Sequence, residues 1–456
     1  MAVAFMVAGA SSNVGKTTVT STLMHVLKSK GLTVQAFKCG PDYLDPTFHA
    51  FVTGRPSINL DLHMMGQEGV RESFHRHMQG VDVGVVEGVM GMFDGGDSNL
   101  DNGSAAHLSR ILGIPVILIV DGSGVATTLA ASVLGFKLFD ERVDLKGVLV
   151  NKVGSGMHYS LLKEPIERYT GVKTLGYIEK HASIDLDSRH LGLKPASEVE
   201  NLSGMLDFLK THTDHTVDYE ELLKSDFEYV SQPVAIFLEA KAEYRIAVAM
   251  DAAFYFYYQD NLDTMRRAGM ELVPFSPIKD TSLPKDIDAI YIGGGYPELH
   301  AKALSENKAL LKEIRKSSQE GLPIYAECGG MMYLTRSIED MNGTAYEMVG
   351  VFDGRARMTE KLQRFGYVDV HLNEDTILGV KGTELKGHEF HRSTVDWNDT
   401  DLCYTVKKSY RSTKTWRCGA YVNHTLGAYA HLHFGNRQEV LEPLLECIRK
   451  RRTANG

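Results

Sequence analysis

Apolar runs of strand length alternate along the chain with longer segments whose apolar positions recur at helical spacing. In the first half, residues 17–30 predict a helix, and strands are predicted at residues 2–8, 33–38, 81–86, 115–120 and 145–150. Buried strands that alternate with helices are typical of a parallel sheet covered on both faces. We therefore predict an α/β fold for this half.

A second series of strands begins after a polar, acidic stretch at residues 211–232. Its members are predicted at residues 245–250, 288–292, 323–326 and 427–432. We therefore predict a first domain over residues 1–210, a linker over 211–243, a second α/β domain over 244–440 and a C-terminal helix or tail over 441–456.

Composition narrows the class of protein. A chain of 456 residues is too long for one ordinary core, and its formal net charge of −9 gives no reason to expect nucleic-acid binding. The five cysteines are scattered without CxxC spacing, so we expect neither disulfides nor a zinc knuckle and favour a reducing cytoplasm. No apolar run approaches the roughly 20 residues that a membrane helix needs, and the first residues are typical of a strand rather than a signal peptide.

A phosphate-binding loop follows the first predicted strand and opens the first helix. Its small residues would let backbone N–H groups surround a phosphate, while Lys16 would reach the β and γ phosphates and Thr17 would bind Mg²⁺. Five residues separate Gly9 from Gly15, one more than is usual, yet the strand–loop–helix context supports ATP binding. The candidate ATP-binding residues are Gly9, Ser12, Asn13, Gly15, Lys16, Thr17 and Thr18.

Acidic residues follow other strands of the same sheet. Glu87 ends a buried strand and is a candidate Mg²⁺ ligand, because ligands bind at the carboxyl ends of parallel strands. Asp42 and Asp45 are candidates for handling a metal and an acyl group, with turn capping as the alternative, and Asp94 follows Glu87 in the other acidic cluster. Asn151 ends another strand, and we expect it either to contact the adenine edge or to serve only as a turn residue.

Cys328 is the candidate nucleophile of the second domain. It follows the apolar run 322–325 and precedes Gly329 and Gly330, which predicts a sharp turn between a strand and a helix, where the thiolate is favoured. The glycines Gly294 and Gly295, which also follow a strand, are candidate oxyanion donors.

A catalytic thiol also needs a base, and His431 and His433 are both available near the end of the chain. Residues two apart share one face of a strand, so either histidine could point at the thiol. We favour His433, because a loop would expose it. The sequence His388-Glu389-Phe390-His391 lacks the spacing of a zinc motif and has no evident third ligand, so we do not predict a metal there.

Together these motifs resemble the cobyrinate a,c-diamide synthase family. The resemblance covers nearly the whole chain and rests on residues 9–18, 40–46, 87–88, 94–95, 189–193, 293–298, 326–330 and 431–434. It implies a dethiobiotin-synthetase-like ATP domain followed by a triad-type glutamine amidotransferase domain. It also implies that Cys328 releases ammonia from glutamine and that ATP activates two carboxylates of a cobyrinate-like tetrapyrrole as acyl phosphates.

The resemblance further implies that Lys16, Thr17 and Glu87 serve ATP and Mg²⁺, whereas Asp42, Asp45 and Asp94 act at the carboxylate. Related amidotransferases often carry Glu two residues after the catalytic histidine, where this chain has Gly435. We therefore expect a Cys–His pair without an orienting acid.

Several alternatives stay open at this stage. The same chemistry could act on hydrogenobyrinate or nickel-sirohydrochlorin, and a nucleotide-driven switch with an inert thiol domain would be a different class of protein. The sequence is silent on oligomeric state, so a homodimer is an open alternative to a monomer.

Overall fold

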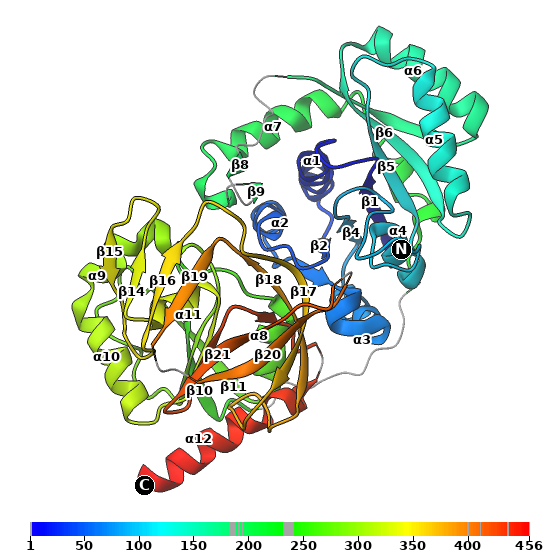
Figure 1. Ribbon diagram of the computed structural model, residues 1–456. Coiled ribbons are helices and arrows are strands. Elements are labelled where there is room, and N and C mark those ends of the chain that lie inside the picture. The colour runs from blue at the N-terminus through cyan, green and yellow to red at the C-terminus, as the bar shows by residue number, and fades with distance from the viewer. Residues whose placement is uncertain are drawn as a thin grey trace. The chain divides into compact units, whose positions relative to one another are not determined.

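The computed structural model describes residues 2–181, 188–189, 192–193, 195–230, 241–398, 401–410, 412–435 and 437–455. The chain divides into two compact units, residues 1–235 and 236–456 (Figure 1). The α/β fold predicted for both is confirmed. His190 and Leu191, which belong to one of the family motifs, lie outside the described residues, as do residues 231–240 of the predicted linker.

The first unit alternates strands and helices as its hydrophobic pattern predicts. Its principal elements are β1 (Val3–Gly9), α1 (Lys16–Ser29), β2 (Val34–Cys39), α2 (Asp45–Thr53), β3 (Ile58–Leu60), α3 (Leu62–His77), β4 (Val83–Glu87), α4 (Ala105–Leu112), β5 (Val116–Asp121), α5 (Thr128–Phe139), β6 (Leu145–Val153), α6 (Gly156–Thr170), β7 (Lys173–Glu179) and α7 (Leu202–Thr213). A two-stranded ribbon, β8 (Ser188–Arg189) and β9 (Gly192–Leu193), follows β7.

The described strands of this unit form a parallel sheet in the order β3-β2-β4-β1-β5-β6-β7. Every residue of β1 is buried, because α1, α2 and α7 cover one face of the sheet and α3, α4, α5 and α6 cover the other. The carboxyl ends of β1, β2 and β4 therefore meet at one edge, where Gly9, Cys39 and Glu87 end their strands. That edge carries the candidate ATP site.

The stretch after residue 210 differs from the prediction. Helix α7 runs to Thr213, and short 3₁₀ turns place Leu222 and Phe227 in the core of the first unit. Residues 211–229 are therefore part of this unit rather than a linker. Their apolar residues are spaced too irregularly for helical or strand periodicity, so the sequence pattern did not show that they are buried.

The second unit contains a larger mixed sheet. Its elements are β10 (Tyr244–Ala249), α8 (Gln259–Arg267), β11 (Met270–Phe275), β12 (Ala289–Ile292), α9 (Ala301–Glu306), α10 (Lys308–Gln319), β13 (Ile324–Glu327), α11 (Gly329–Leu334), β14 (Ser337–Glu339), β15 (Ala345–Glu347), β16 (Gly354–Met358), β17 (Arg364–Leu372), β18 (Glu384–His391), β19 (Ser393–Trp397), β20 (Leu402–Lys408), β21 (Thr415–Val422), β22 (Thr425–Ala428), β23 (His431–Leu432) and α12 (Glu442–Asn455).

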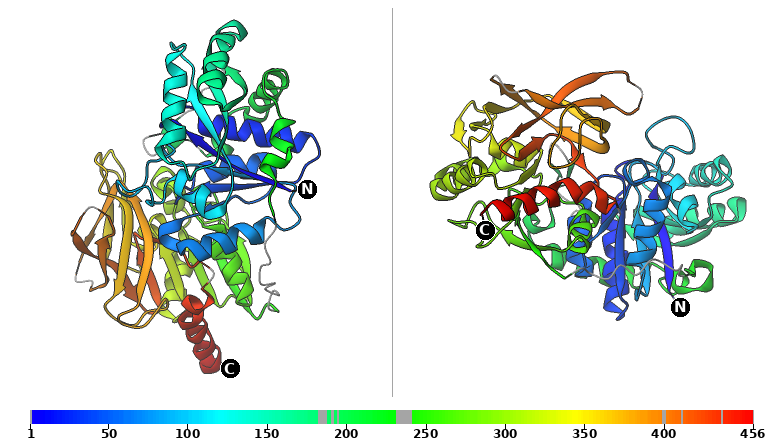
Figure 2. Two further views of the ribbon diagram at one scale, coloured as in Figure 1. Left: turned by 90° about the vertical axis from the view of Figure 1, so that its right-hand side faces the viewer. Right: turned by 90° about the horizontal axis from the view of Figure 1, so that it is seen from below.

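The main sheet runs β11-β10-β12-β13-β22-β21-β20-β17-β18-β23 in the described part of the chain. The strands from β11 to β22 are parallel, and the rest form an antiparallel extension, drawn mostly in orange in Figure 2. A smaller sheet has the order β15-β14-β16-β19, and its strands come before β17 and between β18 and β20 in the chain.

The run predicted as one strand at residues 427–432 is two strands in the structure. β22 ends at Ala428 and pairs with β13, whereas β23 begins at His431 and pairs with β18. The break at Tyr429 and Ala430 takes the chain from a central strand of the sheet to the strand at the end of the antiparallel extension. Within the described residues, no helix is long and apolar enough to cross a membrane.

Candidate active sites

The phosphate loop connects β1 to α1 and has the backbone shape that a phosphate cradle requires. Gly15 has φ 87° and Asn13 has φ 63°, both in the left-handed region. A Cβ at Gly15 would lie 2.4 Å from Nδ2 of Asn151, so only glycine fits. Ser12 and Asn13 are exposed at the loop tip, and Thr18 is half-buried in the first helical turn. Because α1 begins at Lys16, the loop amides gather at a helix N-terminus.

Asn151 supports this loop from β6. Its side-chain amide donates to the carbonyl of Val14 over 2.8 Å, and its Oδ1 accepts from the backbone N–H of Lys152 over 2.9 Å. Both ends of the amide are thus used within the chain. The structure therefore favours a role in shaping the loop, and it does not support the expected contact with an adenine edge.

The side chains of Lys16 and Thr17 lie where the loop meets the acids. Lys16 Nζ donates to the carbonyl of Ser11 over 3.3 Å, and burial lowers the pKa of this lysine. Thr17 Oγ1 donates to Glu87 Oε1 over 2.9 Å. The sheet therefore brings together the two residues that we expect to hold Mg²⁺.

Lys38 is the centre of a buried ionic network that the sequence analysis did not assign. Its ammonium lies 2.5 Å from Asp45 Oδ2 and 3.0 Å from Glu87 Oε1, and it is 2% exposed. Burial alone would lower the pKa of Lys38, but Asp45 and Glu87 outweigh it and raise that pKa. Lys38 therefore stays charged and neutralises the two carboxylates. A lysine in a strand that is otherwise buried was the available signal for it.

The pKa values of the two carboxylates in this network, Glu87 and Asp45, are shifted in opposite directions. Burial would raise the pKa of Glu87, yet Lys38 and the His49 imidazole, whose Nε2 lies 2.7 Å from Oε2, hold it well below its usual range. Burial and the neighbouring Asp42 raise the pKa of Asp45 despite its contact with Lys38. The network therefore contains one acid that its neighbours keep ionised and one acid whose charged form is disfavoured by burial and by Asp42.

Asp42 and Asp94 have different surroundings from Asp45. Asp42 Oδ1 accepts from the backbone N–H groups of Leu44 and Asp45 over 2.7 and 3.2 Å, so it caps the turn that carries Asp45. Asp94 is exposed and its Oδ2 accepts from the N–H of Gly91 over 2.9 Å. The turn-capping alternative for Asp42 is therefore the arrangement that the structure contains.

Cys328 occupies the sharp turn expected between β13 and α11. Its φ of 47° and ψ of −105° are strained for a residue with a Cβ, and its N–H donates to the carbonyl of Ala428 over 2.7 Å. A Cβ at Gly330 would lie 2.2 Å from the carbonyl oxygen of Ile292, so the turn can pack this tightly only with glycine. The parallel strands therefore hold the thiol at their carboxyl ends.

His431, and not His433, faces this thiol. The His431 ring hydrogen-bonds with Cys328, and burial, which would lower the pKa of His431, is outweighed by Cys328 and Glu327, which raise it to about 10. His433 lies beyond the end of β23, where its Nδ1 accepts from the N–H of Gly435 over 2.9 Å. The preference for His433 is thus wrong, because the two histidines do not share one strand.

Glu327 supplies the acid that the sequence analysis did not find. Its Oε2 lies 3.7 Å from Nδ1 of His431, and the residue is 1% exposed. Tyr325 and Tyr291 donate their hydroxyls to it over 2.5 and 3.1 Å, and the N–H of Leu432 donates over 3.0 Å. These three hydrogen bonds hold the Glu327 carboxylate in place. The expectation of a Cys–His pair without an orienting acid is corrected, since the acid precedes the cysteine instead of following the histidine.

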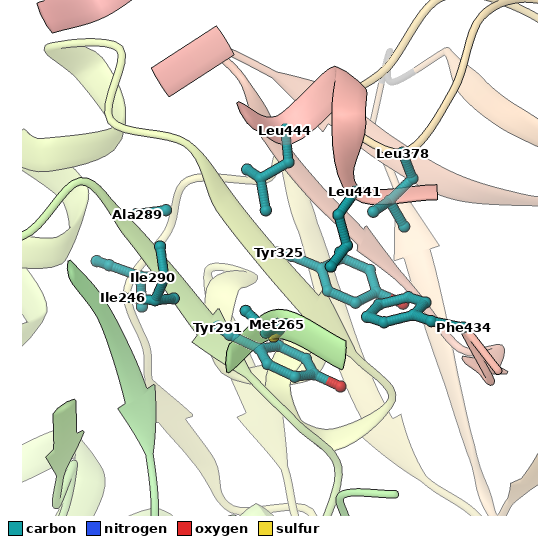
Figure 3. Close-up of a pocket in the computed structure, with 10 residues that line it drawn as sticks. All are labelled: Ile246, Met265, Ala289, Ile290, Tyr291, Tyr325, Leu378, Phe434, Leu441 and Leu444. Carbon is teal, nitrogen blue, oxygen red and sulfur yellow. The ribbon is translucent and has the colours of Figure 1, made fainter. Parts of the chain in front are cut away.

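The tyrosines that hold Glu327 are fixed by apolar packing. Figure 3 shows Tyr291 and Tyr325 among the side chains that line a small cavity, with Phe434 and Leu441 beside Tyr325. The two tyrosine rings stack with centroids 5.1 Å apart. Burial raises the pKa of both phenols, and Glu327 raises it further. Both hydroxyls therefore remain donors to the carboxylate across the physiological range.

Gly294 and Gly295 pack directly against the thiol centre. A Cβ at Gly294 would lie 2.3 Å from Cε1 of His431, and one at Gly295, whose φ is 153°, would lie 2.1 Å from the carbonyl oxygen of Ala253. Gly329, the residue after the cysteine, also packs against this loop, since its Cβ would be 3.2 Å from the N atom of Gly295. The expected oxyanion residues are thus beside the expected nucleophile.

Comparison with known proteins decides the family. Residues 5–193 match the CobQ/CobB/MinD/ParA nucleotide binding domain, and residues 245–439 match the CobB/CobQ-like glutamine amidotransferase domain. The chain is 45% identical over 450 residues to the cobyrinate a,c-diamide synthase of Listeria monocytogenes, covering 98% of this chain and 99% of the relative. It is 41% identical over 445 residues to that of Caldanaerobacter subterraneus, covering 97% of each. The chain belongs to the cobyrinate a,c-diamide synthase family.

Membership in the cobyrinate a,c-diamide synthase family gives the two units their biochemical class. The protein is a glutamine-hydrolysing ligase in which a nucleotide-binding domain precedes a glutamine amidotransferase domain. A relative from Fusobacterium nucleatum, 43% identical over 455 residues, carries the same name and spans 96% of this chain and 99% of its own length. The resemblance inferred from the motifs is therefore confirmed.

Proposed function

We propose that this enzyme amidates the a and c carboxylates of cobyrinate with ammonia that Cys328 releases from glutamine. The observation that carries the proposal is the arrangement of Cys328, His431 and Glu327 in a chain that also has a phosphate loop. The names of the relatives support the choice of macrocycle.

In the glutaminase half, Cys328 attacks the side-chain amide of glutamine as a thiolate. His431, held protonated between the thiol and Glu327, gives its proton to the leaving ammonia and then activates the water that cleaves the thioester. The backbone N–H groups of Gly294 and Gly295 stabilise the oxyanion of the tetrahedral intermediate. The strained turn at Cys328 keeps the sulfur in position for this attack.

In the synthetase half, the loop residues Gly9, Ser12, Asn13, Gly15, Lys16 and Thr18 hold the triphosphate of ATP, with Asn151 supporting the loop. Mg²⁺ fits beside Thr17 Oγ1, Glu87 and Asp45, because the carboxylates of Glu87 and Asp45 already converge on one cation, Lys38, and the Thr17 hydroxyl contacts Glu87. When bound, the metal neutralises charge on the phosphates.

Activation of the carboxylate completes the proposed reaction. A carboxylate is a poor acyl donor, so transfer of the γ phosphoryl group to it produces an acyl phosphate, which ammonia attacks with loss of phosphate. Lys16 and Lys38 provide positive charge beside the phosphoryl group, while Asp45 and Asp94 lie toward the substrate and Asp42 fixes the turn of Asp45. The enzyme therefore consumes one ATP for each amide.

An isotope experiment tests the acyl phosphate. Cobyrinate labelled with heavy oxygen in its carboxylates is turned over with ATP and glutamine, and the released phosphate is analysed by mass spectrometry. Transfer of one label to phosphate for each amide formed supports the proposal, whereas unlabelled phosphate contradicts it. The same assay with hydrogenobyrinate and nickel-sirohydrochlorin in place of cobyrinate identifies the macrocycle by which substrate gains two amides.

The remaining expectations concern location and assembly. We retain the cytoplasm as the compartment and a homodimer as the assembly to be tested. Leu138, Phe139, Met157 and Leu161, which lie on α5 and α6, are exposed apolar side chains that favour self-association. Light scattering across a dilution series measures the assembly, and a monomer at all concentrations would contradict it.

A further inference from the structure

Glu389, in the antiparallel extension of the second unit, is a buried acid without a hydrogen-bond partner. It is 1% exposed, and neither of its carboxylate oxygens has a donor within the described part of the chain. A buried carboxylate without donors is costly, so such residues are retained where a ligand or catalytic step needs them. The fold alone gives no reason for an acid at this position.

His391 lies next to Glu389 on the same face of β18. Its Nε2 is 3.7 Å from Glu389 Oε2, which is too long for a hydrogen bond, and this nitrogen also has no partner among the described residues. The ring of His391 is held by its Nδ1, which lies 2.8 Å from the carbonyl oxygen of Ser393. It also stacks on the ring of Tyr429, with the two ring centroids 3.7 Å apart. The carboxylate of Glu389 and Nε2 of His391 therefore lie side by side, and both can form hydrogen bonds to a ligand.

This position lies in the wall of the glutaminase centre. β18 pairs with β23 so that His388, the residue before Glu389, opposes the catalytic candidate His431, which places the backbone of Glu389 one residue from that pair and its side chain on the other face of β18. Tyr429, which covers His391, directly follows the residue whose carbonyl accepts from the N–H of Cys328. Glu389 and Cys328 are both close enough to Tyr429 to raise the pKa of its phenol. A ligand held at Glu389 would thus be a neighbour of the thiol.

We propose that Glu389 binds the α-ammonium group of glutamine while Cys328 attacks its side-chain amide. This proposal rests on the proposed glutaminase function and specifies how that site recognises its substrate. An ammonium group has three N–H donors and a positive charge. It could therefore donate hydrogen bonds to the two oxygens of Glu389 and neutralise the carboxylate. No third His, Cys, Asp or Glu converges with Glu389 and His391 in the described residues, so a metal is not the expected occupant.

The test compares glutamine with glutaramate, the same amide without the α-amino group, in the full-length enzyme and in Glu389→Gln. Glu384→Gln, at the exposed start of the same strand, is the matched control. We expect Glu389→Gln to lower kcat/KM for glutamine about 30-fold or more, since one partner of a buried charged pair is lost. It should leave kcat/KM for glutaramate and the ammonia-dependent amidation unchanged, and the control should behave as the wild type.

Equal losses with glutamine and glutaramate would make Glu389 a structural residue and overturn the proposal, as would no loss with either. Alkylation of Cys328 by iodoacetamide at the wild-type rate shows that the second unit of the variant is folded. A wild-type enzyme that used only free ammonia would overturn the glutaminase function itself, and with it the role of Glu389.

Discussion

Glu327 Oε2 lies 3.7 Å from Nδ1 of His431, and the two residues are joined through the backbone as well, since the N–H of Leu432 donates to the same carboxylate. The acid immediately precedes the nucleophile in sequence, so one strand end provides both the thiol and the group that orients its base. This arrangement carries the first prediction.

Glu327→Gln should shift the alkaline limit of glutaminase activity to lower pH. The pKa of His431 is raised to about 10, so its proton, and the stability that it contributes, are present below the ordinary imidazole pKa and are lost as the pH rises through about 10. Removing the charge of Glu327 takes away part of that increase. A pH profile of kcat/KM for glutamine measures the shift, and an unchanged alkaline limit would show that Glu327 does not act on His431.

His431→Ala should abolish glutamine use, whereas His433→Ala should retain much of it. General acid–base groups contribute about 10²- to 10⁴-fold, and His431 is the histidine that hydrogen-bonds with the thiol. Both variants remove a buried imidazole, 2% exposed in each case, so they are matched in burial. Glutamate release is the measurement. A larger loss in His433→Ala would return the role of base to that residue.

Lys38→Met should destabilise the first unit by about 3–5 kcal/mol, because it leaves two carboxylates buried without their counter-ion. It should also remove ammonia-dependent amidation while glutaminase activity in the second unit persists. Lys146→Met is the control, since that lysine is 36% exposed and pairs with the exposed Asp144. Chemical denaturation measures the stability, and equal effects in the two variants would contradict the importance of the network.

Asn151→Ala should weaken ATP binding without loss of the fold. The carbonyl of Val14 loses its donor, which costs about 1–3 kcal/mol if the carbonyl stays buried, and the loop loses the contact that positions Gly15. The KM for ATP should rise more than that for ammonia. If instead only nucleotide specificity changes, with GTP accepted as well as ATP, then Asn151 contacts the base and not the loop.

The sequence predicted the parts of the fold that rest on local patterns. Strands β1, β2, β4 and β5 begin and end within two residues of their expected bounds, because their apolar runs are continuous and bounded by turn residues. The antiparallel extension was not predicted. Its strands have one exposed face, so their patterns are less continuous, and their pairing is set by tertiary contacts.

In the candidate sites, too, the residues in local sequence motifs were predicted, and those that depend on contacts between distant strands were not. The phosphate loop and Cys328 were found because their glycines and neighbouring strands are adjacent in sequence. His433 was preferred wrongly because a loop was expected to expose it, whereas it is 2% exposed and β23 ends at Leu432, before it. Lys38 and Glu389 could not be assigned, since their partners or their lack of partners appear only when distant strands are paired.

The central claim is that Cys328 makes ammonia for chemistry that is carried out at the phosphate loop. The most direct test is Cys328→Ser assayed with cobyrinate and ATP, with glutamine and with free ammonia in parallel. We predict that amidation with glutamine is lost while amidation with ammonia remains at the wild-type rate. Normal use of glutamine by the variant, or ATP turnover that neither nitrogen source affects, would contradict the account.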